Sequence, residues 1–381
     1  MTLFKNKMKF IYIANVRIPT EKAHGIQIMK MCESFALHNV EVELVLPQRF
    51  NKIKEDPFEY YGVRRNFKIK KLPCLDLITL DKYIGHLGFW IESITFNFFV
   101  FPYILFKKAD IIYTRDEFSL PLILFKKNLV FEAHTFPKNY FLYSLFLKRL
   151  KKIIVITQKL KDFFTKKGIS ADKILIASDG VDLEKFNIKD SQEECRRRLS
   201  LPIDKKIVLY TGHLYEWKGA QILAKASQFL LKDMEIYFVG GIDEDVRKFK
   251  VQNSKLKIKV MGHKPYSEIP FWLKAADVLV LPNSGKQDIS KYWTSPLKLF
   301  EYMASKRPII ASNLPSIKEI LSENNSFLVE PDNPEKLAGG IKNALKNPNF
   351  SVKISNQAFY DVLSYSWKKR ANNILQFLKY D

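Results

Sequence analysis

The stretch from Ser295 to Ala311 most constrains what this chain can fold into, because its pattern is a loop, a short helix and then a buried strand. Ser295 is a favourable N-cap residue, and Pro296 follows it at the first helical position, where proline is tolerated. Lys306-Arg307-Pro308 closes the predicted helix, and the apolar run Ile309-Ile310-Ala311 is typical of a buried strand.

Two charged residues on this helix indicate a ligand. With Ser295 as N-cap, Lys298 takes the third helical position, where Glu or Gln would complete a capping box, and it faces the positive end of the helix dipole. A bound anion would offset that repulsion. The free N–H groups of the first turn and the Lys298 ammonium therefore predict a phosphate-binding site. The Glu301 carboxylate can accept hydrogen bonds from two vicinal ribose hydroxyls, so the pair indicates a nucleotide. The alternative is a surface lysine and a solvated glutamate on an ordinary amphipathic helix.

Six sequence signals lie in a fixed order between Ile174 and Val329. The signals are Ser178-Asp179-Gly180-Val181-Asp182 with Phe186, Gly212-His213-Leu214 with Lys218-Gly219, Gly240-Gly241, Gly262-His263, Ala276-Asp277-Val278, and Pro296-Leu297-Lys298 with Glu301-Tyr302-Met303-Ala304. Through them the chain resembles the donor-binding half of family 4 (group 1) retaining glycosyltransferases. The amino-terminal half matches that family more loosely.

The resemblance implies an α/β protein of the GT-B fold, with two doubly wound parallel-sheet domains that face a central cleft. We expect residues 1–185 to bind the acceptor, residues 186–364 to bind the nucleotide-sugar donor, and a helix over 365–381 to pack back on the first domain. A length of 381 residues suits two domains, and a hydrophobic content of 47% excludes disorder. The charge-rich segment Lys185–Lys206 is the predicted interdomain linker.

The resemblance also assigns roles to single residues. His134 is expected to touch the donor sugar, and Lys218 and Lys298 to stabilise the leaving diphosphate as catalytic residues. The alternative for His134 is a structural role, and for Gly25 a turn glycine beside a solvated histidine. The residues expected to bind the donor are Gly25, Gly212, His213, Gly262, His263, Ser295 and Glu301.

The chain departs from the family pattern at two positions. The family usually has arginine five residues before Lys218, where this chain has His213. It also has a glutamate eight residues before Glu301, where this chain has Trp293. Because that glutamate contacts the transferred sugar, the hypothesis is that Asp288 replaces it.

The implied function is transfer of a hexose, with retention, from a UDP- or GDP-sugar to a glycan or lipid-linked acceptor, in surface polysaccharide or glycoconjugate synthesis. We expect neither metal nor cofactor, because Asp243-Glu244-Asp245 reads as the acidic start of a helix. The alternatives are a GT-B sugar-nucleotide epimerase and a non-catalytic nucleotide-binding relative. We expect no nucleic-acid partner, because the sequence has no compact recognition module.

The amino-terminal half begins with the pattern of a parallel sheet. Lys9–Ala14 and Val40–Leu46 are apolar, strand-like runs that flank a predicted helix over Ile26–Leu37. The loop Val16–Gly25 joins the first strand to this helix. Further strands are predicted at Ala109–Tyr113, Asn128–Ala133, Lys152–Ile156 and Ile174–Ala177.

The net charge of +22 predicts an acidic partner: nucleic acid, anionic membrane or phosphorylated substrate. The apolar run Phe89–Phe106 is long enough to span a membrane, but Glu92, Asn97 and Pro102 interrupt it. We therefore expect a buried or half-buried helix, with monotopic membrane contact as the alternative. Pro137–Lys152 mixes aromatic residues with lysines, which suits either a membrane interface or a core helix with a basic end.

Three scattered cysteines predict neither disulfides nor a metal site and favour a reducing compartment. Residues Met1–Met8 do not read as a signal peptide. We expect a cytoplasmic protein, with peripheral contact with the inner face of the plasma membrane as a further expectation.

Overall fold

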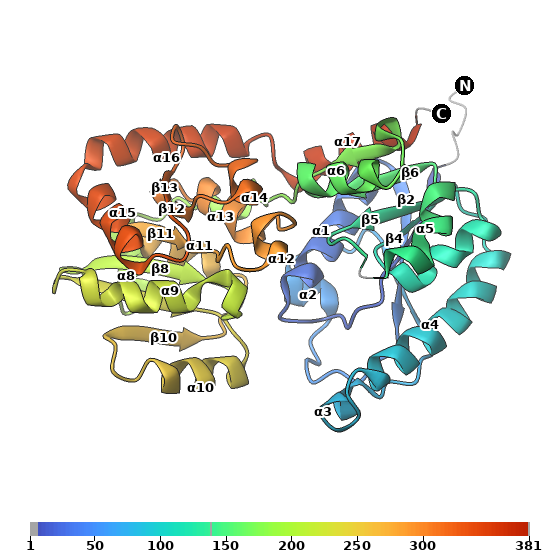
Figure 1. Ribbon diagram of the computed structural model, residues 1–381, viewed down its shortest axis with the longest axis horizontal. Helices are drawn as coiled ribbons and strands as arrows, with labels where there is room; N and C mark the ends of the chain where they lie inside the picture. Colours follow the sequence, from blue (N-terminus) through green and yellow to red (C-terminus); the bar gives the residue numbers. More distant parts are fainter. Residues whose placement is uncertain (1–6, 138, 380–381) are drawn as a thin grey trace. The chain divides into compact units, whose positions relative to one another are not determined.

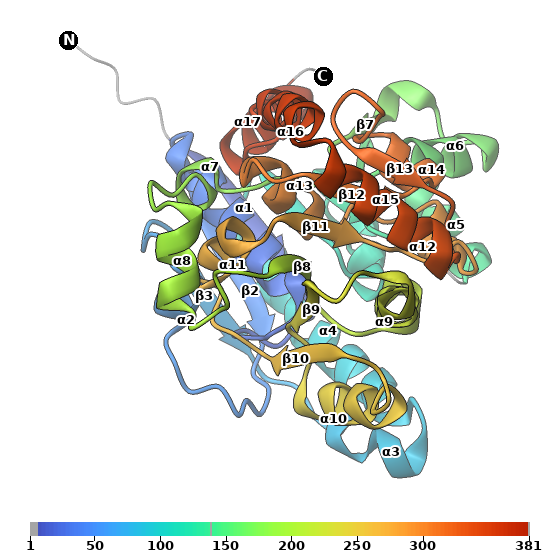
Figure 2. The same cartoon turned by 90° about the vertical axis from the view of Figure 1, so that its left-hand side faces the viewer.

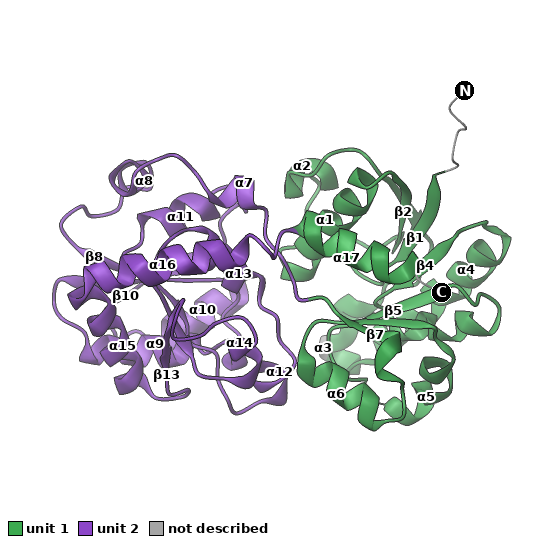
Figure 3. Ribbon diagram, turned by 90° about the horizontal axis from the view of Figure 1, so that it is seen from above, with its two compact units in different colours: residues 1–177, 367–381 green, residues 178–366 purple. Residues whose placement is uncertain are grey.

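The computed structural model describes residues 7–137 and 139–379, which form two compact units (Figure 3). Unit 1 comprises residues 1–177 and 367–381, and unit 2 comprises residues 178–366. The segment Lys185–Lys206, expected as a linker, lies inside unit 2 and contains the helix α8 (Gln192–Arg198), so that prediction is wrong. The interpretations of the first six residues and of Tyr380 lie outside the described residues.

A seven-stranded parallel sheet forms the centre of unit 1 in the part of the chain that the structure describes (Figure 1). The strand order is β3-β2-β1-β4-β5-β6-β7, so the direction of winding reverses between β1 and β4. This confirms the predicted doubly wound sheet. The strands are β1 (Met8–Ile13), β2 (Val40–Pro47), β3 (Lys68–Leu72), β4 (Ile111–Thr114), β5 (Leu129–Ala133), β6 (Lys152–Val155) and β7 (Ile174–Ile176).

Helices surround the sheet of unit 1, and the last helix of the chain returns to it. This helix, α17 (Trp367–Lys379), packs against α1 (Ala23–Leu37). The other helices are α2 (Pro57–Tyr61), η1 (Ile78–Leu80), α3 (Asp81–Ile84), α4 (Leu87–Phe106), η2 (Glu117–Leu124), α5 (Tyr140–Arg149), α6 (Gln158–Lys166) and η3 (Ala171–Lys173), where η denotes a 3-10 helix.

Unit 2 is built on a six-stranded parallel sheet in its described residues, with the order β10-β9-β8-β11-β12-β13. The winding reverses between β8 and β11, as expected for a second doubly wound domain. The strands are β8 (Lys206–Thr211), β9 (Met234–Val239), β10 (Ile258–Gly262), β11 (Val278–Leu281), β12 (Ile309–Ser312) and β13 (Phe327–Val329).

The helices of unit 2 cover both faces of this sheet (Figure 2). They are α7 (Leu183–Phe186), α8, η4 (Glu216–Lys218), α9 (Ala220–Ala226), η5 (Ser227–Phe229), α10 (Asp243–Gln252), α11 (Ile269–Ala275), α12 (Asp288–Lys291), α13 (Leu297–Ala304), α14 (Pro315–Lys318), α15 (Pro334–Lys346) and α16 (Pro348–Val362).

Alternate residues of the unit 2 strands enter two separate hydrophobic cores. On β8, Ile207 and Leu209 join the core that includes Trp272 of α11. Val208 and Tyr210 point to the opposite face and join the core under α9 and α15. Because both faces of β8 are covered, the residues from Ile207 to Tyr210 form a continuous hydrophobic run.

Arg196 of α8 is buried and forms an ion pair with Asp277, where Nη2 and Oδ2 lie 2.6 Å apart. The same guanidinium donates to the carbonyl oxygens of Ala275, Ile203 and Lys205. These contacts hold α8 against the residues that immediately precede β11. The segment Lys185–Lys206 therefore packs as part of unit 2.

Arg196→Met should lower the free energy of unfolding of unit 2 by about 3 kcal/mol, because it leaves the Asp277 carboxylate without its buried partner. Denaturant titration followed by circular dichroism measures the change. The neighbouring Arg197→Met is the control, since the Arg197–Glu193 pair is exposed and should contribute less than about 1 kcal/mol. Equal losses in the two variants would contradict this account.

Candidate functional site

The predicted donor residues of unit 2 gather at the carboxyl ends of β8 and β11, where the winding of the sheet reverses. Gly212 follows β8 directly, and Gly219 packs against the loop after β11. A Cβ atom at Gly219 would lie 1.7 Å from the carbonyl oxygen of Pro282, and its φ is +74°. Only glycine therefore allows these two loops to meet, at the place where doubly wound sheets bind ligands.

The helix α13 begins one residue later than predicted. Its N-cap is Pro296, which has no side chain able to cap, so Lys298 takes the second helical position. Ser295 is therefore not the N-cap. Its Oγ instead accepts a hydrogen bond of 3.0 Å from the backbone N–H of Asp179, which ties α13 to the segment that enters unit 2.

Lys298 is buried, with 7% of its surface exposed. Its Nζ donates to the carbonyl oxygen of Thr211 over 3.1 Å and lies 3.7 Å from the centre of the Tyr210 ring. Burial lowers the pKa of Lys298 well below its usual value, and the neighbouring Lys218 lowers it further. Among the residues that the structure describes, no carboxylate lies within ion-pair distance of this buried amine, so an anionic ligand would be strongly attracted to its charged form.

Glu301 lies one turn along the same helix and is also buried. The Tyr266 hydroxyl donates to its Oε1 over 2.9 Å. Burial raises the pKa of Glu301 to about 7, although the bond from Tyr266 and the charge of Lys185 act in the opposite direction. Lys185 in turn sits 4.1 Å from the centre of the Tyr266 ring. The carboxylate is thus held in one orientation by a neighbour that the sequence analysis missed.

Lys218 ends the short helix η4 and is followed by Gly219. Burial lowers its pKa to about 8, while the charge of Glu301 raises it. His213 is also buried, and its ring stacks on Tyr215 at 4.9 Å between centres and 3° between planes. The structure therefore brings Lys218, Lys298 and Glu301 into mutual electrostatic contact, with His213 on the adjoining loop.

Three glycines lie at the ends of neighbouring strands, Gly212 and Gly240 directly after β8 and β9, and Gly262 as the last residue of β10. Gly212, Gly240 and Gly262 have φ angles of +111°, +118° and +73°, which favour glycine. The N–H of Gly240 donates to the carbonyl oxygen of Gly262, and a Cβ at Gly240 would lie 2.6 Å from the carbonyl oxygen of Gly212. Gly262 faces open space and His263 is exposed. Gly240 thus lets the ends of neighbouring strands pack closely, while Gly212 presents backbone without a side chain beside Lys298.

Gly25 belongs to unit 1 and lies in the first turn of α1, not in the preceding loop as predicted. A Cβ at this position would lie 2.1 Å from the Tyr61 hydroxyl oxygen. That hydroxyl donates to the carbonyl oxygen of Thr20 and accepts from its N–H, so it fixes the loop after β1. Packing against Tyr61 explains the glycine here without a ligand.

His134 follows β5 in unit 1, and its Nε2 lies 2.6 Å from Oε1 of Glu132. Glu132 is fully buried and also accepts from Arg370 of α17 over 2.7 Å, from Gln27 of α1 over 3.0 Å and from the Tyr113 hydroxyl. Burial would raise the pKa of Glu132, but Arg370 and His134 hold it well below its usual value. An ionised carboxylate therefore orients His134.

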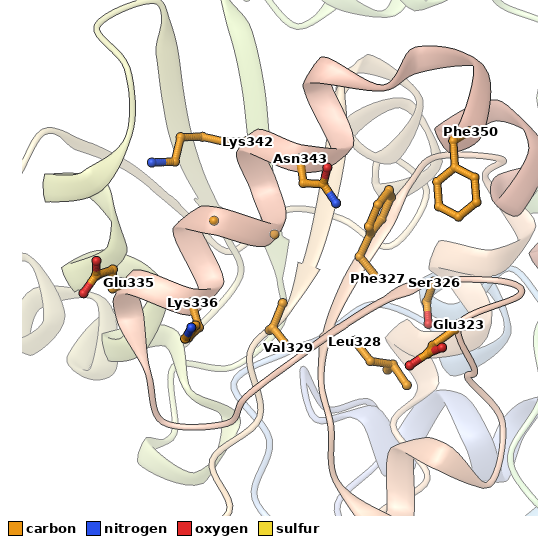
Figure 4. Close-up of a pocket in the computed structure, with 12 residues that line it drawn as sticks. Glu323, Ser326, Phe327, Leu328, Val329, Glu335, Lys336, Lys342, Asn343 and Phe350 are labelled. Atoms are coloured by element: carbon orange, nitrogen blue, oxygen red, sulfur yellow. The ribbon is translucent and has the colours of Figure 1, made fainter.

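A cavity lies elsewhere in unit 2, beside the edge strand β13 (Figure 4). It has a volume of about 700 Å³ and is lined by Val329, Lys336, Lys342, Asn343 and Phe350, among others. None of the predicted site residues lines it. We therefore assign the candidate site from the cluster of charges at the strand ends and not from this cavity.

The sequence analysis missed Tyr266 and Arg370. Tyr266 could have been noticed because it follows Gly262-His263 by a few residues. Arg370 carried no local signal, since it is one of several cations on a terminal helix.

The cluster of Lys218, Lys298 and Glu301 lies in the part of the chain that is similar to known proteins. Residues 205–347 match the family model described as Glycosyl transferases group 1. This segment contains every predicted site residue except Gly25 and His134.

The chain is 28% identical over 218 residues to an uncharacterized glycosyltransferase of Methanocaldococcus jannaschii, an alignment covering 55% of this chain and 54% of that protein. It is 25% identical over 224 residues to D-inositol 3-phosphate glycosyltransferase 1 of Catenulispora acidiphila, covering 55% and 52%. The chain thus spans about half the length of the curated relatives it matches.

Among solved structures, the chain resembles the Anabaena HepE protein in complex with UDP and glucose, with a TM-score of 0.78 and 16% identity. The match covers 98% of this chain and 99% of that one. The chain has the GT-B fold. The sequence-based fold class is thereby confirmed, whereas the roles of the individual residues stay predictions.

Arg370→Met should lower the free energy of unfolding of unit 1 by about 3 to 5 kcal/mol, because Glu132 would remain buried without its cation. Lys368→Met, at an exposed position of α17, should change it by less than about 0.5 kcal/mol. Denaturant titration checks both values. Adding Glu132→Gln to Arg370→Met should recover part of the loss, and no recovery would contradict the charge pairing.

Binding of inorganic sulfate, an anion that does not itself titrate near pH 8, should take up protons at that pH. Burial lowers the pKa of Lys218 to about 8 and that of Lys298 well below its usual value, so the two lysines are incompletely charged before the anion binds. A bound anion favours the charged lysines and raises both pKa values. Calorimetry in buffers of different ionisation enthalpy measures the uptake, which should shrink in Lys218→Met. Proton release at this pH would refute the anion seat.

Proposed function

We propose that this protein is a retaining glycosyltransferase that moves a hexose from a nucleotide diphosphate sugar to a hydroxyl group of a glycan or lipid-linked acceptor. The observation that carries the proposal is the cluster of Lys218, Lys298 and Glu301 at the switch point of the unit 2 sheet. The cluster lies inside the segment that matches the group 1 glycosyl transferases.

The arrangement suits a nucleoside diphosphate better than a simple anion. Lys298 and Lys218 present cations to a diphosphate, and the bare backbone at Gly212 lets it approach them. Glu301, held by Tyr266, offers a carboxylate to the two ribose hydroxyls. UDP is the first nucleotide to test, because the HepE structure was solved with UDP.

In the proposed reaction the bond between the anomeric carbon and the diphosphate oxygen breaks, and a bond from the acceptor oxygen to the same face of that carbon forms. The acceptor proton passes to the departing phosphate. Negative charge grows on the diphosphate, and preorganised cations at Lys218 and Lys298 stabilise it, typically by a few kcal/mol. We propose that no metal takes part, so transfer should persist in EDTA.

Two other functions use the same nucleotide site. A sugar-nucleotide epimerase would change the donor without an acceptor, and a non-catalytic relative would bind nucleotide and leave the donor intact. Nuclear magnetic resonance of a UDP-hexose with and without acceptor separates them from a transferase, and the anomeric coupling in the product tests retention.

Glu301→Gln should weaken UDP binding by roughly tenfold or more, because a charge-assisted hydrogen bond contributes about 1.5 to 3 kcal/mol. Titration calorimetry with UDP, and then with GDP, measures the affinity. Glu335→Gln is the control, since Glu335 is exposed on α15. Wild-type affinity in Glu301→Gln, with the fold intact, would refute the nucleotide site.

A further inference from the structure

One face of α4 in unit 1 is apolar and exposed. Phe106 and Phe98 are 88% and 73% exposed, far beyond what a helix in a soluble core shows. The outer face also carries Trp90, Ile94, Phe99 and Leu105 as exposed side chains. Among the described residues, α4 is the one helix long and apolar enough to cross a membrane, and a third of that stretch is buried.

The opposite face of α4 is fastened to unit 1 by polar contacts. Asn97 donates to Oδ2 of Asp116 over 3.0 Å and accepts from Ser119 over 2.8 Å. Asn15, which follows β1, donates to Ser93 over 3.0 Å. Inserting α4 across a bilayer would break these buried bonds, each of which is costly to leave unmade. The helix therefore stays on the unit and shows its apolar face outward.

Exposed apolar side chains also lie on the elements that pack beside α4. The chain after η2 packs on α4 through Phe125, whose ring centre lies 6.5 Å from that of Phe101. Phe125 is itself 61% exposed. The helix α5 packs on η2 and exposes Phe141 and Leu145. We call the exposed side chains of α4, the end of η2 and α5 the apolar surface.

Cations border this apolar surface. Lys108 follows α4 and Lys127 follows η2, and both are exposed. α5 ends in Lys148 and Arg149, which are also exposed. The single acidic residue of α4, Glu92, is buried.

We propose that the apolar surface docks onto an anionic lipid bilayer, with α4 lying in the plane of the interface. Aromatic rings and aliphatic side chains enter the headgroup and acyl boundary, while the bordering lysines meet anionic headgroups. A second copy of this chain is a poorer occupant, because two chains of net charge +22 would place like charges together around the contact. The proposal goes beyond the transfer reaction and does not depend on it.

Flotation of the full chain with vesicles tests the surface. The protein should bind vesicles that contain phosphatidylcholine with about one third phosphatidylglycerol. The double variant Phe98→Ser/Phe106→Ser should lose binding by roughly tenfold or more, because two large apolar side chains no longer enter the interface. The matched control Val251→Ser/Phe350→Ser removes exposed apolar side chains from unit 2 and should bind like the wild type.

The cationic border has its own test. Lys108→Gln/Lys127→Gln should weaken binding to the anionic vesicles by roughly tenfold and leave binding to pure phosphatidylcholine unchanged, since each lysine contributes about 1 kcal/mol at a charged surface. Binding to anionic vesicles should also fall as salt is raised. Thermal unfolding followed by circular dichroism checks that every variant is folded, because the substituted residues of α4 and of the chain after η2 lie in unit 1 and the control residues lie in unit 2.

Three outcomes would overturn the proposal. They are a wild-type protein that stays unbound with anionic vesicles, a Phe98→Ser/Phe106→Ser variant that binds as well as the wild type, and a wild-type dimer that this variant dissociates. The last would assign the surface to a second copy. Vesicle binding in Glu301→Gln should equal that of the wild type, so a failure of the membrane proposal is distinguishable from a failure of the nucleotide site.

Discussion

Unit 1 depends on one carboxylate that has no access to water. Glu132 stands at the carboxyl end of β5, fully buried, and its charge is balanced by Arg370 from α17. Without that cation, burial would favour the neutral acid, and the bonds to Tyr113, Gln27 and His134 would lose strength. The same interaction therefore holds the end of the chain on the first sheet and sets the orientation of His134. A structural contact and a candidate functional contact share one carboxylate.

Unit 2 differs from unit 1, because a bound ligand would balance the buried charges of Lys298 and Glu301. Burial pushes the pKa of Lys298 down and that of Glu301 up, so by themselves both groups favour their neutral forms. Neutral groups at the end of a sheet cost less to bury than ions, and a diphosphate with its ribose would restore both charges. Stability without ligand and affinity for ligand thus oppose each other at the same helix.

The fold was largely readable from the sequence, because a strand covered on both faces, such as β12, forms an unbroken apolar run. The edge strand β3 was not predicted, since it is rich in lysine, and neither were β9 and the three-residue β13. The start of α13 was misplaced by one residue because Ser295 is a better cap by type than Pro296, yet its hydroxyl is used by Asp179. A tertiary hydrogen bond therefore overrode the local preference of serine for the N-cap position. Lys298 and Glu301 were found because both lie on one helix, where spacing alone places them together.

The sequence by itself determined the alternation of strands and helices, the two-domain α/β class and the pairing of a cation with a carboxylate on α13. These follow from periodicity and short-range spacing, which the chain carries locally. The tertiary structure decided which partners surround those groups: Tyr266 beside Glu301, Thr211 beside Lys298, and Arg370 beside Glu132 across 238 positions of the chain. It also decided which face of α4 is buried against unit 1, through polar contacts, and which is exposed. The sequence of α4 is apolar on nearly all sides of the helix, so it does not indicate which face the domain covers.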